Sequence, residues 1–511
     1  MTLTPAPIRR GPLWILLALL LTATVFRLHN LTAPSLWFDE RASVMSAEGH
    51  LGDWLNLPLD RVIPAPDFSS TAHQASLLAA WRSPDFHPPL FAITLRCWRD
   101  LFGDSDAAAR SLSVVVSLAA IVFLFDLGRT LFDTPSASWA CAVMAVAQPQ
   151  IQYAQEARGY ALWGALFLAA SAAAARLYKY GPGWPRAISL AACSLAMLLT
   201  HFLAFASIAA IGIWCAIYLR GRAARQTLVA YASALVVLLI VGAPLVSVAV
   251  ENHQDAMWLR EQVAGHVAAT VKRVALLPAR FLAEPLKGTE ILSSATAVAY
   301  VIPFLLFRKS AGMAWCALVL CMGVGAVLTM DLILKAAALS YIRFTLAAAP
   351  AVYLVISAVP LRRGLRELIP AAAIAGCLLS LPATYDVSWK GEWRELGGDL
   401  RHVASPGDIV VFASPPHLFL ADPAKLYEGV AFYANPIRCP ILILDRPADA
   451  EALRHLHDAH RIWIITTNGG VDLGAELPGY RCSPAGPDRL FCGRLWRAVP
   501  ATAESPTTKP K

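Results

Sequence analysis

Long apolar runs separated by short polar stretches fill most of the first 385 residues. Eleven runs are candidates for crossing a bilayer, at residues 13–28, 109–127, 136–149, 159–178, 187–201, 202–219, 227–249, 290–307, 311–330, 344–360 and 369–384. A helical span needs about 20 mostly apolar residues, and a helix satisfies its own backbone hydrogen bonds in lipid. A closed barrel needs short alternating segments, and these runs do not alternate. The pattern predicts a polytopic α-helical membrane protein with about eleven transmembrane helices.

The basic residues fix the expected orientation of these helices. Arg9 and Arg10 precede the first run, which places the N-terminus in the cytoplasm by the positive-inside rule. The later basic clusters all fall on the same inner side: Arg129, Lys179 with Arg186, Arg220 with Arg222 and Arg225, Arg308 with Lys309, and Arg362 with Arg363 and Arg366. The first run lacks a clear small-residue cleavage site and more spans follow it, so we expect an uncleaved helix rather than a signal peptide. Eleven spans then leave the C-terminal part outside.

Two long polar segments, about residues 29–108 and 251–289, fall on the outer side in this topology. The first contains the amphipathic pieces "SLLAAWRS" and "PPLFAITLRCWRDLF", and the second contains "DAMWLREQVAGHVAATVKRVALLPARFL". Apolar residues at helical spacing with charges between them are typical of helices that lie on a membrane surface. We expect surface helices in both segments.

The pattern changes to short strand-like runs after about residue 386. The stretch "EWRELGGDLRHVASPGDIVVFASP" predicts a helix, a turn and a strand; "ILILD", a helix over 448–460 and "RIWIITTN" repeat the alternation, and "YRCSPAGPDRLFCGRLWRAV" predicts a hairpin. We therefore divide the chain into a transmembrane domain over 1–385, a small extracytoplasmic α/β domain over 386–498 and a disordered tail over 499–511. The segment "SPPHLFLADPAKLYEGVAFY" fits a loop and helix that form a lid over a site.

The composition agrees with a membrane protein: 57% of the residues are hydrophobic and 15% are charged, against about a quarter charged in soluble domains. The net charge of +8 comes from short clusters between apolar runs, and no nucleic-acid-binding motif is present, so we expect no nucleic-acid partner. No GxGxxG opens a helix and no CxxC spacing occurs. Of the ten cysteines, Cys482 and Cys492 could form a disulfide across the hairpin in an oxidising compartment. Cys439 would then be the unpaired cysteine of this polar C-terminal part.

Unusual polar residues collect at the outer ends of the predicted spans. They are Asp39 and Glu40 after the first run, His87 in the first outer segment, Glu156 and Arg158 at the start of the fourth run, Thr200 and His201 between the fifth and sixth, and Tyr341 and Arg343 at the tenth. Ionisable groups near membrane depth are costly and usually face a cavity or a partner. The convergence of five segments on one side predicts a single polar cavity there.

Each of these residues also has an interpretation without function. Asp39 stands where it could cap the helix that follows, with Glu40 favourable in the first turn. His87 precedes two prolines and fits an ordinary loop, and His201 fits a satisfied buried polar group. Arg343 could extend to the surface from a helix end. The common side of the membrane is the stronger signal.

The pair Glu156 and Arg158 could also be an ordinary interfacial ion pair. Two residues apart on a helix, however, the two side chains point in different directions and cannot readily satisfy each other. We therefore expect each of them to need its own partner.

Several stretches together resemble the GT-C membrane glycosyltransferases. They are "SLWFDERAS" after the first span, "FHPPLF" in the outer loop, "FGDSDAAARSLS", "YAQEARGYAL", "YIRFTLAAAPAVYLV" and the tail's "KGEWRELGGDLRHVASPGDIVV". The group most similar to this set comprises the bacterial relatives of protein O-mannosyltransferases, which include the aminoarabinose and galacturonic acid transferases of lipopolysaccharide. The ordered set covers most of the chain, and no single motif carries it.

The resemblance implies an enzyme of the bacterial inner membrane that moves a sugar, with inversion, from a polyprenyl-phosphate donor to an extracytoplasmic lipid or glycan acceptor. It implies that Asp39 is the catalytic or metal-linked acid, so a divalent metal is a candidate cofactor. Glu40 and Glu156 are the further catalytic candidates. The candidates for binding the donor phosphate or the substrate are Arg158, Arg343, His201, His87, Arg110 and Tyr160, with Lys335 as another cation.

Such a donor already carries a good leaving group, because the phosphate departs as an anion and needs positive charge rather than an acid. If the acceptor is a hydroxyl, a base must take its proton, and Asp39 would serve. If the acceptor is a phosphate, Asp39 would instead orient it or ligate a metal.

Three rival functions fit parts of the pattern. A transporter or lipid-linked sugar flippase also has many spans, but such proteins tend to show repeats and broken helices near the midplane, and the chain shows no repeat. A polysaccharide polymerase would not explain the acidic pair directly after the first span. A sensor with a ligand-binding tail would not explain polar groups on five membrane segments.

Overall fold

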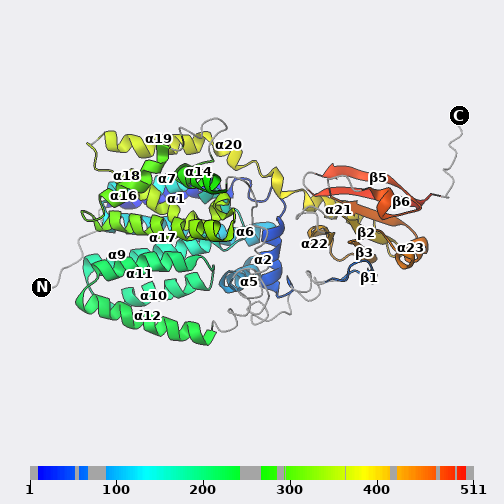
Figure 1. Ribbon diagram of the computed structural model, residues 1–511, viewed down its shortest axis with the longest axis horizontal. Helices are drawn as coiled ribbons and strands as arrows, with labels where there is room; N and C mark the ends of the chain where they lie inside the picture. Colours follow the sequence, from blue (N-terminus) through cyan, green and yellow to red (C-terminus); the bar gives the residue numbers. More distant parts are fainter. Residues whose placement is uncertain are drawn as a thin grey trace. The chain divides into compact units, whose positions relative to one another are not determined.

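The computed structural model describes residues 10–51, 57–66, 88–241, 266–284, 293, 295–362, 364–414, 423–467, 472–489 and 492–501. These residues form two compact units (Figure 1). The first unit comprises Met1–Leu31 and Phe86–Tyr385, and the second comprises Thr32–Asp85 and Asp386–Lys511.

The first unit is built from helices. They are α1 Arg10–Leu28, α5 Leu90–Phe102, α6 Asp106–Leu131, α7 Thr134–Val146, α8 Gln148–Ala154, α9 Tyr160–Tyr180, α10 Trp184–Leu198, α11 Ala204–Tyr218, α12 Gly221–Val241, α14 His266–Arg280, α16 Val298–Leu305, α17 Ala311–Leu334, α18 Ala349–Ser357, α19 Leu365–Leu379 and α20 Leu381–Thr384. Short 3-10 turns are η2 Ala295–Ala297, η3 Ala338–Ser340, η4 Ile342–Phe344 and η5 Leu346–Ala348. Every predicted span carries one of these helices.

Several helices have the length and apolarity of membrane spans. Among the described residues α6, α9, α12 and α17 are long enough to cross, or five spans result if the bent pair that starts with α19 counts as one. Four shorter apolar helices accompany them, in α1, α10, α11 and the segment that ends with α18. The helical membrane architecture is therefore confirmed, and the count of eleven spans stays a prediction. The predicted surface pieces also contain helices, α5 and α14.

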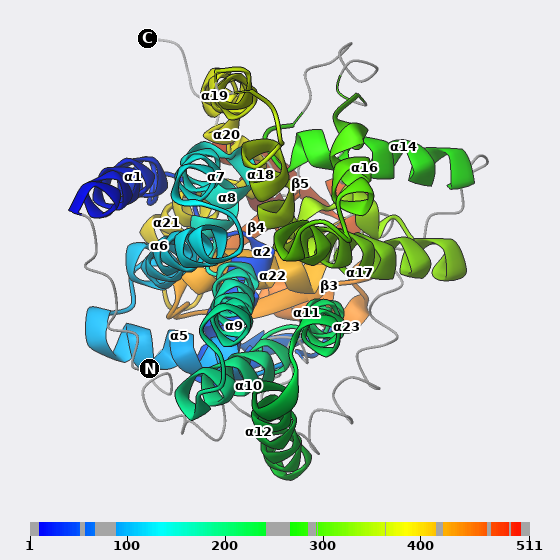
Figure 2. The same cartoon turned by 90° about the vertical axis from the view of Figure 1, so that its left-hand side faces the viewer.

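Small side chains let the central helices approach closely. The helices α6, α9, α10 and α12 follow one another as neighbours (Figure 2). The buried side of α9 is rich in alanine, with Ala172, Ala173, Ala174 and Ala175 all at most 5% exposed. Helices in lipid gain most of their association energy from such close packing. Side-chain caps satisfy backbone amides at the first turns of several helices. In α6, for example, the Ser105 hydroxyl accepts a hydrogen bond from the Ala108 amide.

Two buried polar side chains fasten α1 to its neighbours. Arg27 is fully buried and donates to the carbonyls of Met144 (3.2 Å) and Ala145 (2.9 Å) in the last turn of α7, where the helix dipole favours a cation. Gln155 in turn donates to the carbonyls of Arg27 (3.0 Å) and His29 (2.6 Å) at the end of α1. These bonds hold Gln155, the residue at which the bend after α8 begins.

The second unit holds a six-stranded sheet in the order β1-β3-β2-β4-β6-β5. The strands are β1 Val62–Pro64, β2 Ile409–Ala413, β3 Pro440–Leu444, β4 Ile462–Thr466, β5 Tyr480–Arg489 and β6 Gly493–Pro500. Its helices are α2 Phe38–Glu48, α21 Trp393–Val403, α22 Pro423–Ala434, α23 Ala450–His457 and α24 Leu473–Glu476, with the turn η6 Ser388–Lys390. The three central strands are parallel, and β1, β6 and β5 are antiparallel to their neighbours.

The central strands are apolar on both faces because helices cover both. Val410 and Phe412 of β2 pack in one core with α21, α22 and α2, whereas Ile409, Val411 and Ala413 pack in the other with α23. Successive strand residues point to opposite faces, so a doubly covered strand has a continuous hydrophobic run. The strands expected from "DIVVFASP", "ILILD" and "RIWIITTN" are all present, as is the terminal hairpin.

Three features of the second unit differ from the sequence-based expectations. Residues 32–51 and 57–66 are not an independent loop of the membrane part, because β1 pairs with β3 and α2 shares a core with the sheet. The strand β6 continues to Pro500, beyond the predicted domain end at 498. Cys482 and Cys492 have free thiols, because the register places Cys482 opposite Ala498 and Cys492 at the far end of the hairpin. The piece "SLLAAWRS" lies outside the described residues, as does the loop part of the predicted lid.

Candidate functional site

The bend between α8 and α9 carries Glu156 and Arg158. Both side chains are buried, at 1% and 4% exposure, and the Arg158 amide donates to the Glu156 carbonyl at 2.8 Å. The prediction that they share a helix is wrong: α8 ends at Ala154 and α9 begins at Tyr160. The bend places a carboxylate and a guanidinium at the start of the span instead of on its side.

His201 lies in the turn between α10 and α11 and contacts the start of α9. Its Nδ1 accepts a hydrogen bond from the Leu203 amide at 3.1 Å, so in the neutral ring the proton sits on Nε2. The imidazole stacks on Trp163 with ring centroids 4.7 Å apart, and Tyr160 lies 5.4 Å away on α9. The histidine is 4% exposed.

Arg343 enters the same region from the turn η4. Its guanidinium lies over the rings of Tyr341 (5.2 Å) and Phe344 (5.3 Å), an arrangement that stabilises a cation at low exposure. The turn η4 packs against α8, and the ring of Tyr153 on α8 lies 5.4 Å from the ring of Tyr160 at the start of α9. We call Glu156, Arg158, Tyr160, His201 and Arg343 the bundle cluster.

The other predicted cations have different surroundings. Arg110 of α6 is fully buried and donates to the Leu31 carbonyl at 2.8 Å, which holds the chain beyond α1. Lys335 is exposed and ends α17 in a left-handed conformation with φ 49°. His87 lies outside the described residues.

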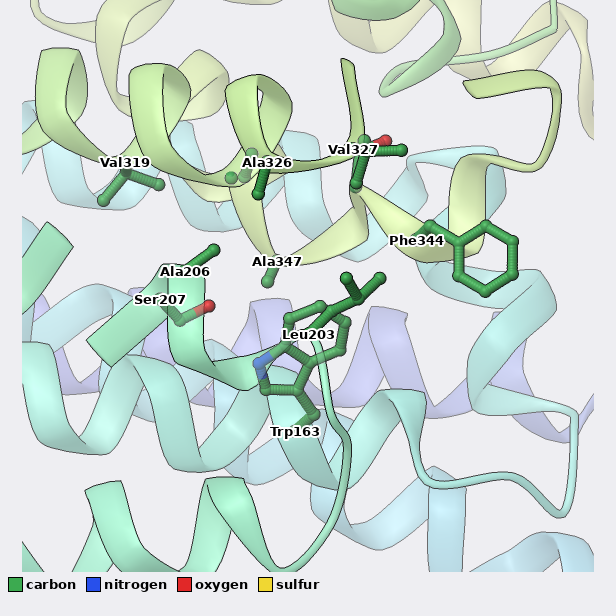
Figure 3. A pocket seen from close by; sticks show the side chains of 12 residues that line it. Trp163, Leu203, Ala206, Ser207, Val319, Ala326, Val327, Phe344 and Ala347 are labelled. Carbon is green, nitrogen blue, oxygen red and sulfur yellow. The ribbon is translucent and has the colours of Figure 1, made fainter. Parts of the chain in front are cut away.

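An apolar pocket borders the bundle cluster within the first unit (Figure 3). Trp163, Leu203 and Phe344 line it together with Ala206, Ser207, Val319, Gly323, Ala326, Val327, Thr345, Ala347 and Ala348. Trp163 and Leu203 contact His201 directly, and Phe344 follows Arg343 in the chain. The arrangement therefore places a small apolar pocket, lined by α9, α11 and α17, beside two guanidinium groups.

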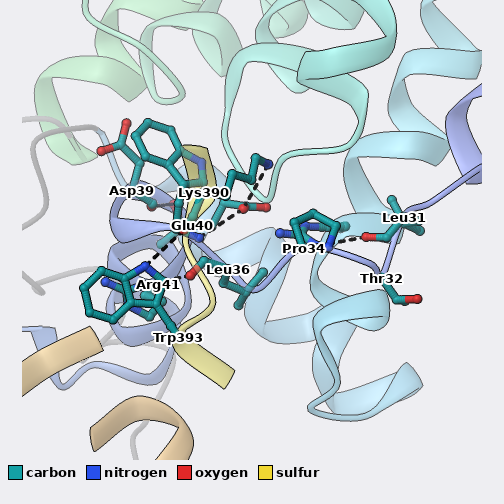
Figure 4. Close-up of polar contacts among 12 residues, drawn as sticks. Leu31, Thr32, Pro34, Leu36, Asp39, Glu40, Arg41, Lys390 and Trp393 are labelled. Carbon is teal, nitrogen blue, oxygen red and sulfur yellow. Dashed lines mark hydrogen bonds and ion pairs between the residues drawn. The ribbon is translucent and has the colours of Figure 1, made fainter. Parts of the chain in front are cut away.

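The acids of "SLWFDERAS" lie on α2 in the second unit. Glu40 is fully buried, pairs with Lys390 Nζ at 3.2 Å and accepts a hydrogen bond from the Trp37 amide at 3.4 Å. The expectation that Asp39 caps the helix is therefore wrong: the helix begins at Phe38, and Glu40 reaches back to the capping position. Asp39 is partly exposed, and its carboxylate points away from the Glu40–Lys390 pair (Figure 4).

Sequence reasoning missed the groups that hold α2. Arg41 pairs with Glu428 of α22, and its guanidinium lies 4.8 Å from the centroid of the Trp393 ring. Arg41 belongs to the motif "SLWFDERAS", but its partners Trp393 and Glu428 lie more than 350 residues later in the sequence. No local sequence pattern identifies these two residues as its partners. Lys390 was equally hidden in the polar stretch before α21.

The described residues offer few side chains that could bind a metal ion together. Within them, no group of three or more His, Cys, Asp or Glu side chains could hold an ion. Glu40, the neighbouring carboxylate on α2, forms an ion pair with Lys390 at 3.2 Å. The residues described around Asp39 therefore do not fit a divalent ion, and we derive no step through one.

Comparison with known proteins supports the resemblance found in the sequence. Residues 86–247, less than half of the chain, match the family described as dolichyl-phosphate-mannose-protein mannosyltransferase. This match bears out the resemblance over these residues. The matched segment contains Arg110, Glu156, Arg158, Tyr160 and His201. No curated protein sequence matches the chain.

Solved structures of glycosyltransferases align with 90–98% of this chain at 11–14% identity. The Archaeoglobus fulgidus oligosaccharyltransferase tethered with an acceptor peptide has a TM-score of 0.50 at 11% identity, covering 90% of this chain and 69% of that one. ArnT from Cupriavidus metallidurans bound to undecaprenyl phosphate has 0.47 at 12%, covering 98% and 100%. The mycobacterial arabinofuranosyltransferase AftD has 0.40 at 14%, covering 97% and 42%. The likeness to the oligosaccharyltransferase shows a shared fold.

Proposed function

We propose that this chain is an inverting glycosyltransferase that moves a sugar from a polyprenyl-phosphate donor to an acceptor outside the cytoplasm. The observation that carries the proposal is the bundle cluster beside the apolar pocket, in a segment similar to enzymes named for a dolichyl-phosphate sugar. Acceptors of the proposed kind are lipid A or lipopolysaccharide, another cell-surface glycan, or protein.

The bundle cluster supplies positive charge for the donor. Arg158 and Arg343 hold the phosphate oxygens, and the first isoprene units of the carrier enter beside Trp163 and Phe344, where the small pocket widens to admit them. As the bond between the anomeric carbon and the phosphate oxygen breaks, the electron pair goes to the phosphate, whose growing charge these guanidinium groups stabilise. No general acid is needed for this departure.

The acceptor oxygen attacks the anomeric carbon from the face opposite the phosphate. If it is a hydroxyl, Asp39 takes its proton; if it is a phosphate oxygen, no proton moves and Asp39 orients the acceptor. Glu156 is suited to hold sugar hydroxyls near the developing positive charge. A partly exposed acid on a fixed helix suits Asp39 to this role better than the buried Glu40.

The same proposal sets the location of the protein. The basic clusters support a bacterial inner-membrane protein with a cytoplasmic N-terminus and with the unit that holds residues 386–498 in the periplasm. The donor's lipid tail then stays in the bilayer throughout the reaction.

The test is turnover of polyprenyl-phosphate sugar in detergent by the purified chain and by Asp39→Asn. We expect release of sugar or of glycosylated acceptor by the native chain and its loss in the variant at normal expression. A transporter or flippase would give no product in micelles, so absence of any product over a panel of donors and acceptors contradicts the enzyme. Mass spectrometry of lipid A and surface glycans from a deletion strain would name the missing sugar and its acceptor.

A further inference from the structure

The turn η3, Ala338–Ser340, is held from two sides by charged residues that the proposed reaction does not use. It lies between the end of α17 and the turn that carries Arg343. The two residues are Asp331 of α17 and Arg280 at the end of α14.

Asp331 binds the amide side of the turn. It is fully buried; its Oδ1 accepts from the Ala338 amide at 2.8 Å, and its Oδ2 accepts from the Leu339 amide at 3.0 Å. Its own carbonyl accepts from the Ala336 amide at 3.1 Å. Between these bonds the chain passes through Lys335, whose positive φ ends the helix. A buried carboxylate that accepts backbone amides fixes a loop strongly, because its loss leaves both amides unsatisfied.

Arg280 binds the carbonyl side of the same turn. Its Nη1 donates to the Leu339 carbonyl at 3.0 Å and its Nη2 donates to the Ser340 carbonyl at 2.9 Å. Both polar groups of Leu339 are therefore held by opposite charges, the amide by Asp331 and the carbonyl by Arg280.

A chain of short turns connects this point to the bundle cluster. The Tyr341 amide donates to the Ala338 carbonyl at 2.9 Å, and the Phe344 amide donates to the Tyr341 carbonyl at 3.2 Å. Arg343 lies inside the second of these turns, so movement of η3 moves its backbone.

The end of α14 also holds the other side of the cluster. The Glu284 amide donates to the Gln148 side chain at 2.7 Å, and the Gln148 amide donates to the Leu282 carbonyl at 2.8 Å. Gln148 begins α8, the helix that leads to the bend with Glu156 and Arg158. One helix end is thus tied to both segments that carry the guanidinium groups of the cluster.

We propose that Asp331 and Arg280 are positioning residues that fix Arg343 for the donor phosphate. This inference rests on the proposed function, in which Arg343 binds that phosphate. Neither residue touches the donor; each acts through the backbone of η3.

The test is a double-mutant cycle on the donor KM. Arg280→Gln and Asp331→Asn should each raise it about tenfold, the effect of weakening one charged hydrogen bond, with a smaller change in kcat. In an Arg343→Gln background the same substitutions should raise the KM no further, because the group they position is gone. Arg280→Lys, which keeps the charge, should restore part of the affinity.

Arg366→Gln is the matched control. Arg366 also donates to a backbone carbonyl, that of Ser357 at 3.1 Å, and binds Asp133 away from the cluster. It should leave the donor KM unchanged. Equal effects of Arg280→Gln in the native and Arg343→Gln backgrounds would overturn the proposal, since they would show an action that bypasses Arg343.

Hydrogen exchange separates this inference from the proposed function. Asp331→Asn should speed exchange of the Ala338 and Leu339 amides whether or not the chain is an enzyme. Unchanged exchange would refute the positioning of η3 by Asp331. Faster exchange together with a native donor KM in Arg343→Gln would instead refute the phosphate-binding role of Arg343 and leave the positioning of η3 intact.

Discussion

Arg41 and Glu428 form a two-point ion pair inside the second unit. Nε lies 2.8 Å from Oε1 and Nη2 lies 3.1 Å from Oε2, and both side chains are 1% exposed. The remaining Nη1 donates to the Leu36 carbonyl at 2.7 Å. The pair joins α2 to α22, which lie 387 residues apart in sequence at this contact. It therefore fixes the helix that carries Asp39 to the sheet unit.

Removing one charge of this pair should destabilise the protein strongly. Glu428→Gln leaves the Arg41 guanidinium buried without its counter-charge, a change that costs about 3–5 kcal/mol in comparable sites. The apolar double replacement of Arg41→Met with Glu428→Leu should recover most of that loss, because it removes both desolvated charges. Chemical denaturation in detergent, monitored by tryptophan fluorescence, measures the free energy of unfolding of both variants.

The exposed pair of Arg494 and Asp488 is the control for this measurement. The Asp488 side chain is 60% exposed, so Asp488→Asn should cost less than about 1 kcal/mol. A Glu428→Gln variant no less stable than Asp488→Asn would show that the Arg41–Glu428 pair contributes little to holding α2.

The helices and central strands were predictable because their signals are local. Apolar runs of span length have one stable backbone conformation in lipid, and each predicted run carries a helix. The runs "IVVFA" and "IWIIT" are continuous in apolar residues because helices cover both faces of the sheet. Patterns of this kind depend only on neighbouring residues.

The attachment of α2 and β1 to the sheet unit was not predictable in the same way. The pairing of β1 with β3 and the contacts of Arg41 join segments hundreds of residues apart. The bend at Glu156 was missed for a related reason: Gln155 is held by the carbonyls at the end of α1, and this tertiary contact overrides the local tendency to continue the helix. Convergence of Arg158, His201 and Arg343 was predictable from topology, because each follows or precedes a span on the same side.

Asp39 and Glu40 should respond differently to loss of charge. Asp39→Asn should leave the unfolding midpoint within a degree or so of the native value and lower kcat by about 10²–10⁴, the usual contribution of a general base. Glu40→Gln leaves Lys390 charged in a buried site, so it should lower the unfolding midpoint first. Thermal unfolding and initial rates on the same preparations separate the two effects. Equal loss of stability in both variants would assign Asp39 a structural role.

Glu476 should make the second unit less stable as the pH rises. Burial raises the pKa of its carboxyl above the ordinary 4.5, with Asp472 and Asp60 adding to the shift. A carboxyl whose pKa is higher in the folded than in the unfolded chain contributes stability below the unfolded pKa and loses that contribution as the pH rises through the folded pKa. Glu476→Gln should therefore raise the unfolding midpoint at pH 7–8 relative to the native chain, and the gain should vanish near pH 4.

The control for Glu476 is Asp458→Asn, whose side chain is 85% exposed. It should change the midpoint by the same small amount at both pH values. A Glu476→Gln gain that persists at pH 4 would mean that the carboxyl is disfavoured by packing rather than by its charge.

Ala326→Phe should obstruct the apolar pocket without unfolding the bundle. Ala326 lines the pocket from α17 (Figure 3), and the added ring occupies space that the first isoprene units would use. Displacing about two methylene groups, at ~0.8 kcal/mol each, should raise the donor KM about tenfold. Leu332→Phe is the control, because Leu332 lies on the same helix with 46% of its surface exposed, and it should leave the KM within about twofold. Native donor affinity in Ala326→Phe, at native stability, would exclude this pocket as the place where the carrier binds. It would direct the search to a second pocket, which Tyr153 and Tyr160 line.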